Sequence, residues 1–126
     1  MKAKGPAALP KKLVNESLEG IELDDVSLAK AKIHNSTFEG AHFDDVEFAK
    51  ADIVNASFKG AKFNDVSFVK AKIKNASFEN AKLDDIDFAN ATIKNSSLAG
   101  LKIEGCSIEG LTIDGVRIDE LIKNKP

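Results

Sequence analysis

The sequence predicts an all-β solenoid, in which the chain winds into a stack of short coils, and three observations support this prediction. A large apolar residue recurs at every fifth position from Leu13 to Ile118, at 22 positions without a miss. A small residue stands two positions before most of them, and a second pattern repeats every 20 residues. Because a period of five fits neither an α-helical turn nor the alternation of a flat strand, the backbone must turn once in every unit.

The large and small registers together define the predicted core. The large positions hold Leu, Ile or Phe, the small ones are mostly Ala or Val, and the other three positions of each unit are mostly polar. Gly or Asn often closes a unit, as at Gly40 and Asn55, because many tight turns need a positive φ there. All eight Phe fall in the large register, and we expect them to stack inside the solenoid: Phe38, Phe43, Phe48, Phe58, Phe63, Phe68, Phe78 and Phe88.

The period of 20 predicts four units in each coil. Ile recurs in the large register at 33, 53, 73, 93 and 113, and pairs of Asp recur at 24–25, 44–45 and 84–85. Residues 20 positions apart should therefore stack at the usual strand spacing of about 4.8 Å. At four units per coil, the 22 units make five and a half coils.

These residues resemble the pentapeptide-repeat family, whose unit is a small residue, Asp or Asn, Leu or Phe, and two variable residues. The resemblance covers about residues 13 to 120, and it implies a right-handed quadrilateral β-helix. The second position of the unit departs from the family pattern, since it is more often Lys or Ser here, as at Lys62 and Ser67. Because that position points outward, the departure should change the surface chemistry and leave the fold intact.

We expect three segments in one domain: an N-terminal tail or cap over residues 1–12, the β-helix over 13–120, and a C-terminal cap and tail over 121–126. The first segment contains Gly5, Pro6, Pro10 and four Lys, which is typical of a tail. From Arg117 to Ile122 the apolar residues have a helix-like spacing, which predicts a short helix or turn. Covers are needed because an open coil exposes apolar faces and unpaired backbone edges.

The net charge of −2 conceals an uneven distribution of charges. All 20 acidic residues and 12 of the 18 basic ones lie in residues 13–120, and the remaining six Lys lie in the two ends. One side of the predicted solenoid gathers the candidate partner-binding residues Asp24, Asp25, Asp44, Asp45, Asp65, Asp84 and Asp85. An adjoining side and corner carry Lys30, Lys32, Lys50, Lys70, Lys72, Lys74 and Lys94.

Two interpretations of the acidic side remain open. Asp tolerates turn geometry and bonds nearby backbone amides, and charge keeps a solenoid soluble. Alternatively, the acidic side binds a basic groove of a partner protein. The family resemblance adds a specific case, because some members are described as mimics of duplex DNA that bind DNA gyrase or topoisomerase IV. This chain is shorter than those proteins, lacks their projecting loops, and has lysines that dilute the acidic field.

The leading functional prediction is therefore a non-enzymatic protein-interaction or structural module whose protein partner is not identified, and the alternative is type II topoisomerase binding through the acidic side. No catalytic, cofactor or metal site is expected. His34 and His42 should lie on different sides of the rod, without further ligands at metal-binding spacing. The sequence has no phosphate loop or dinucleotide fingerprint, and Cys106 falls in the small inward register of the core.

Other partners are constrained by composition. The acidic body, and the lack of aromatic residues beside the lysines, argue against direct nucleic-acid binding. Without an 18-residue apolar run or a signal-peptide pattern, we expect a cytoplasmic protein that does not bind membranes. Leu101, Leu111 and Leu121 enrich the C-terminal end in apolar surface, and family members commonly dimerise end to end. A homodimer through the C-terminal end is therefore expected.

Overall fold

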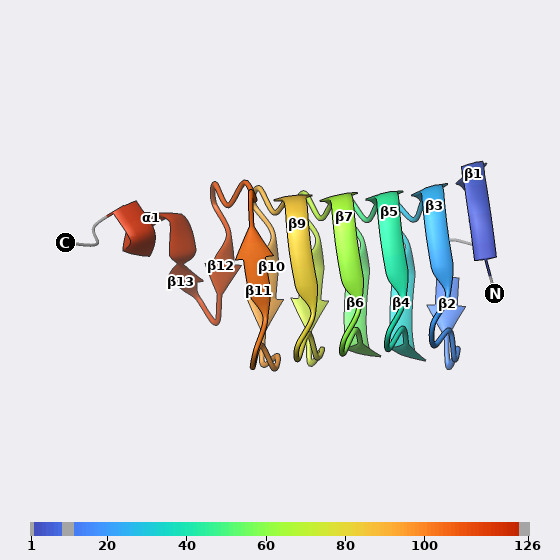
Figure 1. The fold of residues 1–126 in the computed structure, drawn as a ribbon. Coiled ribbons are helices and arrows are strands. Elements are labelled where there is room, and N and C mark those ends of the chain that lie inside the picture. Colours follow the sequence, from blue (N-terminus) through green and yellow to red (C-terminus); the bar gives the residue numbers. More distant parts are fainter. Residues whose placement is uncertain (1, 9–11, 124–126) are drawn as a thin grey trace.

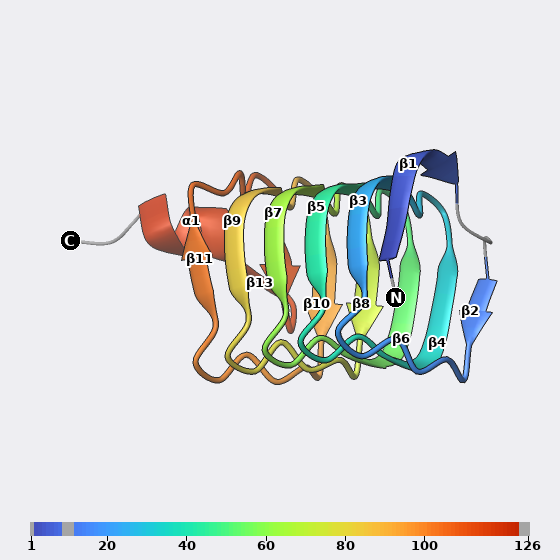
Figure 2. The same cartoon turned by 45° about the vertical axis from the view of Figure 1, so that its right-hand side comes forward.

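The protein is a β-solenoid of about five coils with a short C-terminal helix, as seen in a computed structural model that describes residues 2–8 and 12–123. The coils stack into a straight rod, with β1 (Lys2–Ala8) at one end and α1 (Ile118–Lys123) at the other (Figures 1 and 2). The solenoid and the terminal helix predicted from the sequence are thereby confirmed.

Two sheets run along the rod. In spatial order, the six-stranded sheet contains β1, β3 (Glu22–Ser27), β5 (His42–Glu47), β7 (Lys62–Ser67), β9 (Lys82–Asp87) and β11 (Lys102–Glu104). The seven-stranded sheet contains β13 (Val116–Arg117), β12 (Thr112–Ile113), β10 (Thr92–Lys94), β8 (Lys72–Lys74), β6 (Asp52–Ser57), β4 (Lys32–Thr37) and β2 (Lys12–Val14). Consecutive coils contribute one strand each to both sheets.

The strand register confirms four units per coil. Along the coils, parallel strands pair residues that are 20 apart, as in Leu23 with Phe43 on one sheet and Ile33 with Ile53 on the other. Outside the strands the same offset persists, since the Ser57–Ser77 and Ser77–Ser97 bridges also join positions 20 apart. Every outward side chain therefore lies one strand spacing from its equivalent in the next coil.

The eight Phe side chains fill the interior as three ladders. In the first, Phe58 lies between Phe38 and Phe78, with ring centroids 5.1 Å apart on each side and nearly parallel planes. The other two ladders join Phe43 to Phe63 at 4.6 Å, and Phe48, Phe68 and Phe88 at 5.0 and 5.3 Å. Ile33, Ile53, Ile73 and Ile93 complete the fourth side, and all twelve of these residues are buried. Offset-stacked aromatic rings stabilise one another beyond their burial alone.

A residue with positive φ stands at every corner of the coil, two positions after each large apolar residue. At alternate corners it is the third residue of a hydrogen-bonded turn, such as the turn closed by Ala41 N–H donating to Phe38 O at 3.0 Å. Gly40 occupies that place with φ of 68°, as a type II turn requires. Non-glycine corners use Asn, Asp and Lys: Asn15, Asp25, Lys30, Asn35, Asp45, Lys50, Asn55, Asp65, Lys70, Asn75, Asn80, Asp85, Asn90 and Asn95.

The parallel coil ends at Ile113, earlier than the boundary at residue 120 that we expected from the repeat. Asp114 and Gly115 have φ of 50° and 81°, and β13 folds back antiparallel on β12, pairing Ile113 with Val116. Two successive positive φ values are the requirement of the tight hairpin turn that Asp-Gly favours. The five-residue spacing continues to Ile118, but that residue begins α1.

Asp119 fastens this C-terminal hairpin and helix to the last coil. Its carboxylate accepts hydrogen bonds from Gly110 N–H at 3.0 Å and from the Arg117 guanidinium at 2.9 and 2.7 Å. The hydrogen bonds from Arg117 and Gly110 hold the pKa of Asp119 well below its usual range. Beside it, Ile118 N–H donates to Leu111 O at 3.0 Å. The ionised carboxylate therefore ties β13 and α1 to the turn at Gly110.

At the opposite end, β1 adds a further parallel strand beside β3, with Lys2 opposite Glu22 and Ala8 opposite Ser27. Residues 2–8 of the predicted N-terminal tail or cap thus continue the six-stranded sheet. Residues 1, 9–11 and 124–126 of the two predicted end segments lie outside the described residues.

We expect Phe58→Ala to lower the free energy of unfolding by about 3–5 kcal/mol, because the substitution leaves a cavity between two stacked rings. Urea denaturation followed by circular dichroism measures this loss. The surface variant Lys62→Ala serves as control and should change the free energy by about 0.5 kcal/mol or less. An unfolding midpoint of Phe58→Ala equal to that of the wild type would contradict the role of the ladder.

Candidate functional site

The acidic column, as we call Asp24, Asp25, Asp44, Asp45, Asp65, Asp84 and Asp85, runs along the six-stranded sheet. Along the sheet, strand pairing stacks equivalent residues of successive strands in the order Asp24, Asp44, Asn64, Asp84 and Glu104. Asp25, Asp45, Asp65 and Asp85 follow at the corner, where the ladder pairs the residues on either side of them. The column is therefore a regular stack of carboxylates with the spacing of the coils.

The corner conformation explains part of this composition. Asp25, Asp45, Asp65 and Asp85 all have φ between 55° and 58°. Asp and Asn adopt this left-handed conformation more readily than most residues with a side chain. The corner on the far side of the rod has the same geometry and carries Asn15, Asn35, Asn55, Asn75 and Asn95. Since Asn meets the backbone requirement equally well there, the backbone alone does not require a carboxylate in the acidic column.

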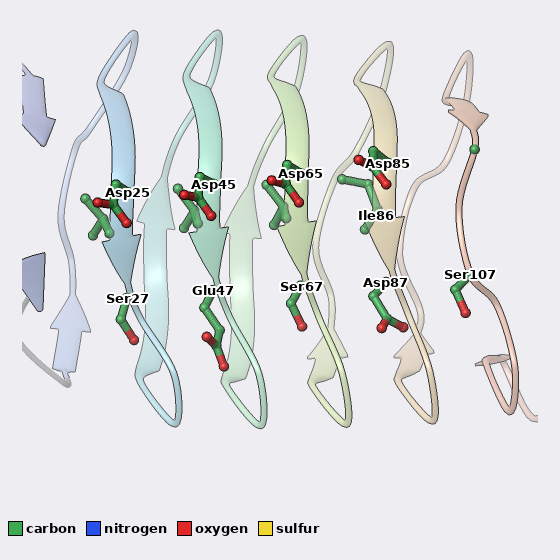
Figure 3. A pocket seen from close by; sticks show the side chains of 14 residues that line it. Asp25, Ser27, Asp45, Glu47, Asp65, Ser67, Asp85, Ile86, Asp87 and Ser107 are labelled. Atoms are coloured by element: carbon green, nitrogen blue, oxygen red, sulfur yellow. The ribbon is translucent and has the colours of Figure 1, made fainter. Parts of the chain in front are cut away.

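A groove lies beside the acidic column, with the corner Asp residues on one wall (Figure 3). Its second row consists of Ser27, Glu47, Ser67, Asp87 and Ser107, and Val26, Val46, Val66 and Ile86 complete the lining between the rows. Glu47 and Asp87 thus extend the acidic surface, although we did not predict these two residues from the sequence. The sequence contained the signal for them, because each stands two residues after an Asp of the column in the same 20-residue period.

The small polar residues of the second row have a structural role of their own. Ser27 and Ser67 hydroxyls accept hydrogen bonds from the backbone N–H two residues later at 3.3 Å, and the Asp87 carboxylate does the same at 2.9 Å. Thr37 and Ser77 make equivalent bonds on the opposite side of the rod. Such local bonds stabilise turns. Glu47 replaces Ser at this row and adds charge to the groove.

Among the carboxyl groups of the column, Asp45 shows a raised pKa. Desolvation, followed by the negative charges of Asp25, Asp65, Asp44 and Asp24, raises the pKa of Asp45 above its ordinary value. A raised pKa means that the folded protein disfavours the ionised form of this carboxyl. The column therefore holds negative charge at some cost to stability, and a cationic partner would relieve that cost.

The lysine face, as we call Lys30, Lys32, Lys50, Lys70, Lys72, Lys74 and Lys94, lies elsewhere on the rod. Lys32, Lys72, Lys74 and Lys94 belong to strands of the seven-stranded sheet. The other three stand at the corner turns that lead into this sheet, with φ of 60–64°. All seven are exposed. These seven lysines thus lie on the seven-stranded sheet and at the corners leading into it, whereas Lys62, Lys82 and Lys102 lie on the strands that carry the acidic column.

The remaining polar candidates lie apart from one another. His34 lies on β4 with its Nε2 3.6 Å from Asp52 Oδ2, whereas His42 lies on β5 in the other sheet. Among the described residues, no group of three or more His, Cys, Asp or Glu is arranged to hold a metal ion. Cys106 is half-buried with its Sγ 3.2 Å from Glu104 O, and burial raises the pKa of its thiol. Within the described residues 2–8 and 12–123, no helix is long and apolar enough to cross a membrane.

The chain matches two family models. One, described as a pentapeptide repeat region, covers residues 41–118, and the other, described as pentapeptide repeats in nine copies, covers residues 18–62. No curated protein sequence matches the chain.

Several solved structures are similar to this one. Rfr23, a pentapeptide repeat protein from the cyanobacterium Cyanothece 51142, is 16% identical with a TM-score of 0.49, over 82% of this chain and 88% of that one. HetL from Nostoc sp. strain PCC 7120, described as involved in heterocyst differentiation regulation, is 17% identical with a TM-score of 0.40, over 87% and 63%. A trypsin-treated form of QnrB1, a plasmid-mediated fluoroquinolone resistance protein, is 17% identical with a TM-score of 0.37, over 85% and 67%.

We expect Asp45→Asn to raise the Tm at pH 7, because it removes the central charge of the column and Asn fits the same corner. In the wild type the cost of ionising Asp45 is present above its raised pKa. It disappears as the pH falls below the ordinary Asp value of about 3.9, where folded and unfolded chains are both protonated. The difference in Tm between variant and wild type should therefore vanish near pH 3, as measured by thermal denaturation.

The control Asn75→Asp adds a carboxylate to the corner on the far side of the rod that carries Asn15, Asn35, Asn55, Asn75 and Asn95, which we call the Asn column. No acidic side chain is stacked on Asn75 there. It should show no comparable loss of Tm between pH 3 and pH 7. A Tm difference for Asp45→Asn that is the same at both pH values would contradict the repulsion.

Proposed function

Because the chain belongs to the pentapeptide-repeat family, we propose that it is a non-enzymatic interaction module whose acidic column binds a basic surface of a protein partner. One observation carries the proposal: the column runs along four successive coils of a rod whose interior is a continuous stack of buried side chains. Such a rod presents its carboxylates at fixed positions, so that binding needs little reorganisation. The stacked charges also attract a basic partner over a distance, which favours fast association.

Type II topoisomerases are the second candidate partner class. The observation that favours them is the acidic column itself, since a surface that binds duplex DNA is basic and would accept a rigid row of carboxylates. Glu47 and Asp87 widen this acidic surface beyond the column. The lysine face lies on the other sheet, so it does not interrupt the acidic groove.

A DNA gyrase supercoiling assay, titrated with the protein and run with and without a quinolone, tests this second candidate. The variant Asp44→Lys, Asp45→Lys, Asp84→Lys, Asp85→Lys should abolish any inhibition or drug protection. Its fold should persist, because Lys50 and Lys70 already occupy corners with the same positive φ. The control Lys32→Glu, Lys72→Glu, Lys74→Glu, Lys94→Glu changes as many charges on the other sheet and should retain the effect.

The same pair of variants tests the broader proposal in an affinity capture experiment. A partner held by the wild type and by the control, but released by the acidic-column variant, would support binding through the column. If gyrase is unaffected and captured proteins bind all three forms equally, the column serves solvation only, and the proposed interface is wrong.

We propose in addition that the chain forms a homodimer through its C-terminal end. Leu121, Ile122 and Val116 are 62%, 55% and 49% exposed, and they are the exposed large apolar side chains of the described residues. Two of these positions differ from the set we expected, since Leu111 is buried and Leu101 half-buried. Exposed apolar residues gathered at one end favour burial against a second copy.

Leu121→Ser with Ile122→Ser should convert the dimer to a monomer, because both substitutions remove exposed apolar surface without touching the coil. Light scattering after size exclusion measures the mass. The control Val54→Ser alters a half-buried apolar residue on the side of the rod and should leave the mass unchanged. A monomer mass for the wild type at high protein concentration would remove this proposal.

A further inference from the structure

The rod carries two long surfaces of opposite charge, and we propose that they bind each other between copies, the acidic column of one rod lying against the lysine face of the next. This lateral contact adds a role for the lysine face, which the proposed function does not use. It requires no component other than a second copy of the chain.

The two surfaces are matched in charge. Each contains seven charged residues, while the whole chain has a net charge of only −2. Repulsion between whole molecules is therefore small. Each surface carries mainly one sign of charge, although Lys62, Lys82 and Lys102 lie on the strands of the acidic column. In the part of the chain that the structure describes, no ion pair joins any of the seven lysines to an acidic group of its own chain. These ammonium groups are available to carboxylates of another molecule.

The two surfaces are also matched in spacing. Four successive coils each contribute to both, at 24–25, 44–45, 65 and 84–85 for the acidic column and at 30–32, 50, 70–74 and 94 for the lysine face. Both sets therefore repeat at the strand spacing of about 4.8 Å. When two such rods lie parallel, every coil of one can face a coil of the other without a cumulative mismatch.

Other occupants lack this match. Side chains on one side of an extended peptide recur about every 6.7 Å, and turns of an α-helix about every 5.4 Å. Either would lose register with the lysines or carboxylates within a few coils. Because a single exposed ion pair contributes little, a contact of this kind depends on repetition in register. The matching spacing thus favours a second copy of this chain over a peptide or a helix.

The placement of the two surfaces determines the form of the assembly. The acidic column belongs to the six-stranded sheet, and the lysine face belongs to the seven-stranded sheet and the turns leading into it. One rod can therefore contact two neighbours at once. Since the contact joins two different surfaces, it is heterologous and extends into rows instead of closing as a dimer. Asp52 interrupts the lysine face, but its carboxylate lies beside His34.

The test is the weight-average mass of the full chain, measured by sedimentation or light scattering across a range of salt and protein concentrations. At about 10 mM salt, where charges act over about 30 Å, the mass should rise with protein concentration to at least about twice the value at 1 M salt. The mass at 1 M salt is the reference, so an apolar end-to-end dimer, which salt does not dissociate, does not affect the result.

Two charge-reversed variants make the test specific. The first carries Asp44→Lys, Asp45→Lys, Asp84→Lys and Asp85→Lys, and the second carries Lys32→Glu, Lys72→Glu, Lys74→Glu and Lys94→Glu. Each alone should remain at its high-salt mass. Mixed in equal amounts, they should associate again, because the first variant keeps the lysine face, the second keeps the acidic column, and the two reversed surfaces also match.

A third variant controls for net charge, since the first two also carry opposite net charges. It carries Lys59→Glu, Lys62→Glu, Lys82→Glu and Lys102→Glu, which gives it the same charge as the second variant while leaving the lysine face intact. At low salt this variant alone should still self-associate, because it keeps both the acidic column and the lysine face, whereas the second variant should not. Equal loss of self-association in the second and third variants would overturn the proposal, because net charge alone would then explain it.

A wild-type mass that is independent of salt would also overturn the proposal. The proposal would also be wrong if the protein bound duplex DNA through the lysine face at low salt and did not self-associate, since the lysine face would then bind a polyanion. The outcome is separable from the proposed function: the second variant should lose self-association and retain any effect on gyrase, whereas the first should lose both.

Discussion

Every part of this rod depends on the stacking of one coil on the next. Backbone bonds such as Phe58 N–H to Ser77 O at 2.7 Å join coils, and the same offset aligns Phe58 with Phe38 and Phe78 in the core. No coil can bury its inner side chains alone, so each is stable only between neighbours. The requirement for a period of 20 inside the rod also imposes that period on the outside, because inward and outward residues belong to the same strands.

The charged surfaces follow from this constraint. A residue type that is repeated every 20 positions becomes a column, and in the column of carboxylates desolvation and then the charges of the neighbouring Asp residues raise the pKa of Asp45. The Asn column at the opposite corner, where Asn55 Nδ2 donates to Asn35 Oδ1 at 3.1 Å, has the same backbone and no such repulsion. The chain therefore keeps Asp at a position where a neutral residue would fit, and this is the physical basis for our proposal that the acidic column binds a partner.

At each end of the rod the terminal coil lacks a neighbouring coil on one side, and other interactions cover it. At the C-terminus, the tight turn at Asp114 and Gly115 reverses the chain, and the Asp119 carboxylate holds the returning segment on the last coil. The reversal pairs β12 with β13, so that the edge of the seven-stranded sheet at this end is a strand of only two residues. It also leaves Leu121 and Ile122 in solvent, so the exposed large apolar side chains of the described residues are gathered at this end.

The sequence by itself determined the coil, its four units and the identity of the inward residues, because each unit repeats the same local requirement for a large side chain and a turn. It also showed the acidic column and the lysine face, since the period of 20 places their members by number alone. Tertiary structure decided where the repeat stops, because Ile118 continues the five-residue spacing while the turn before it has already reversed the chain. The same period placed Glu47 and Asp87 beside the column, but only the structure showed the groove that they line, and only the structure showed that Leu111 is buried and Ile122 exposed. Such differences depend on which face of the rod a residue meets and what covers the last coil, and neither is encoded in a five-residue unit.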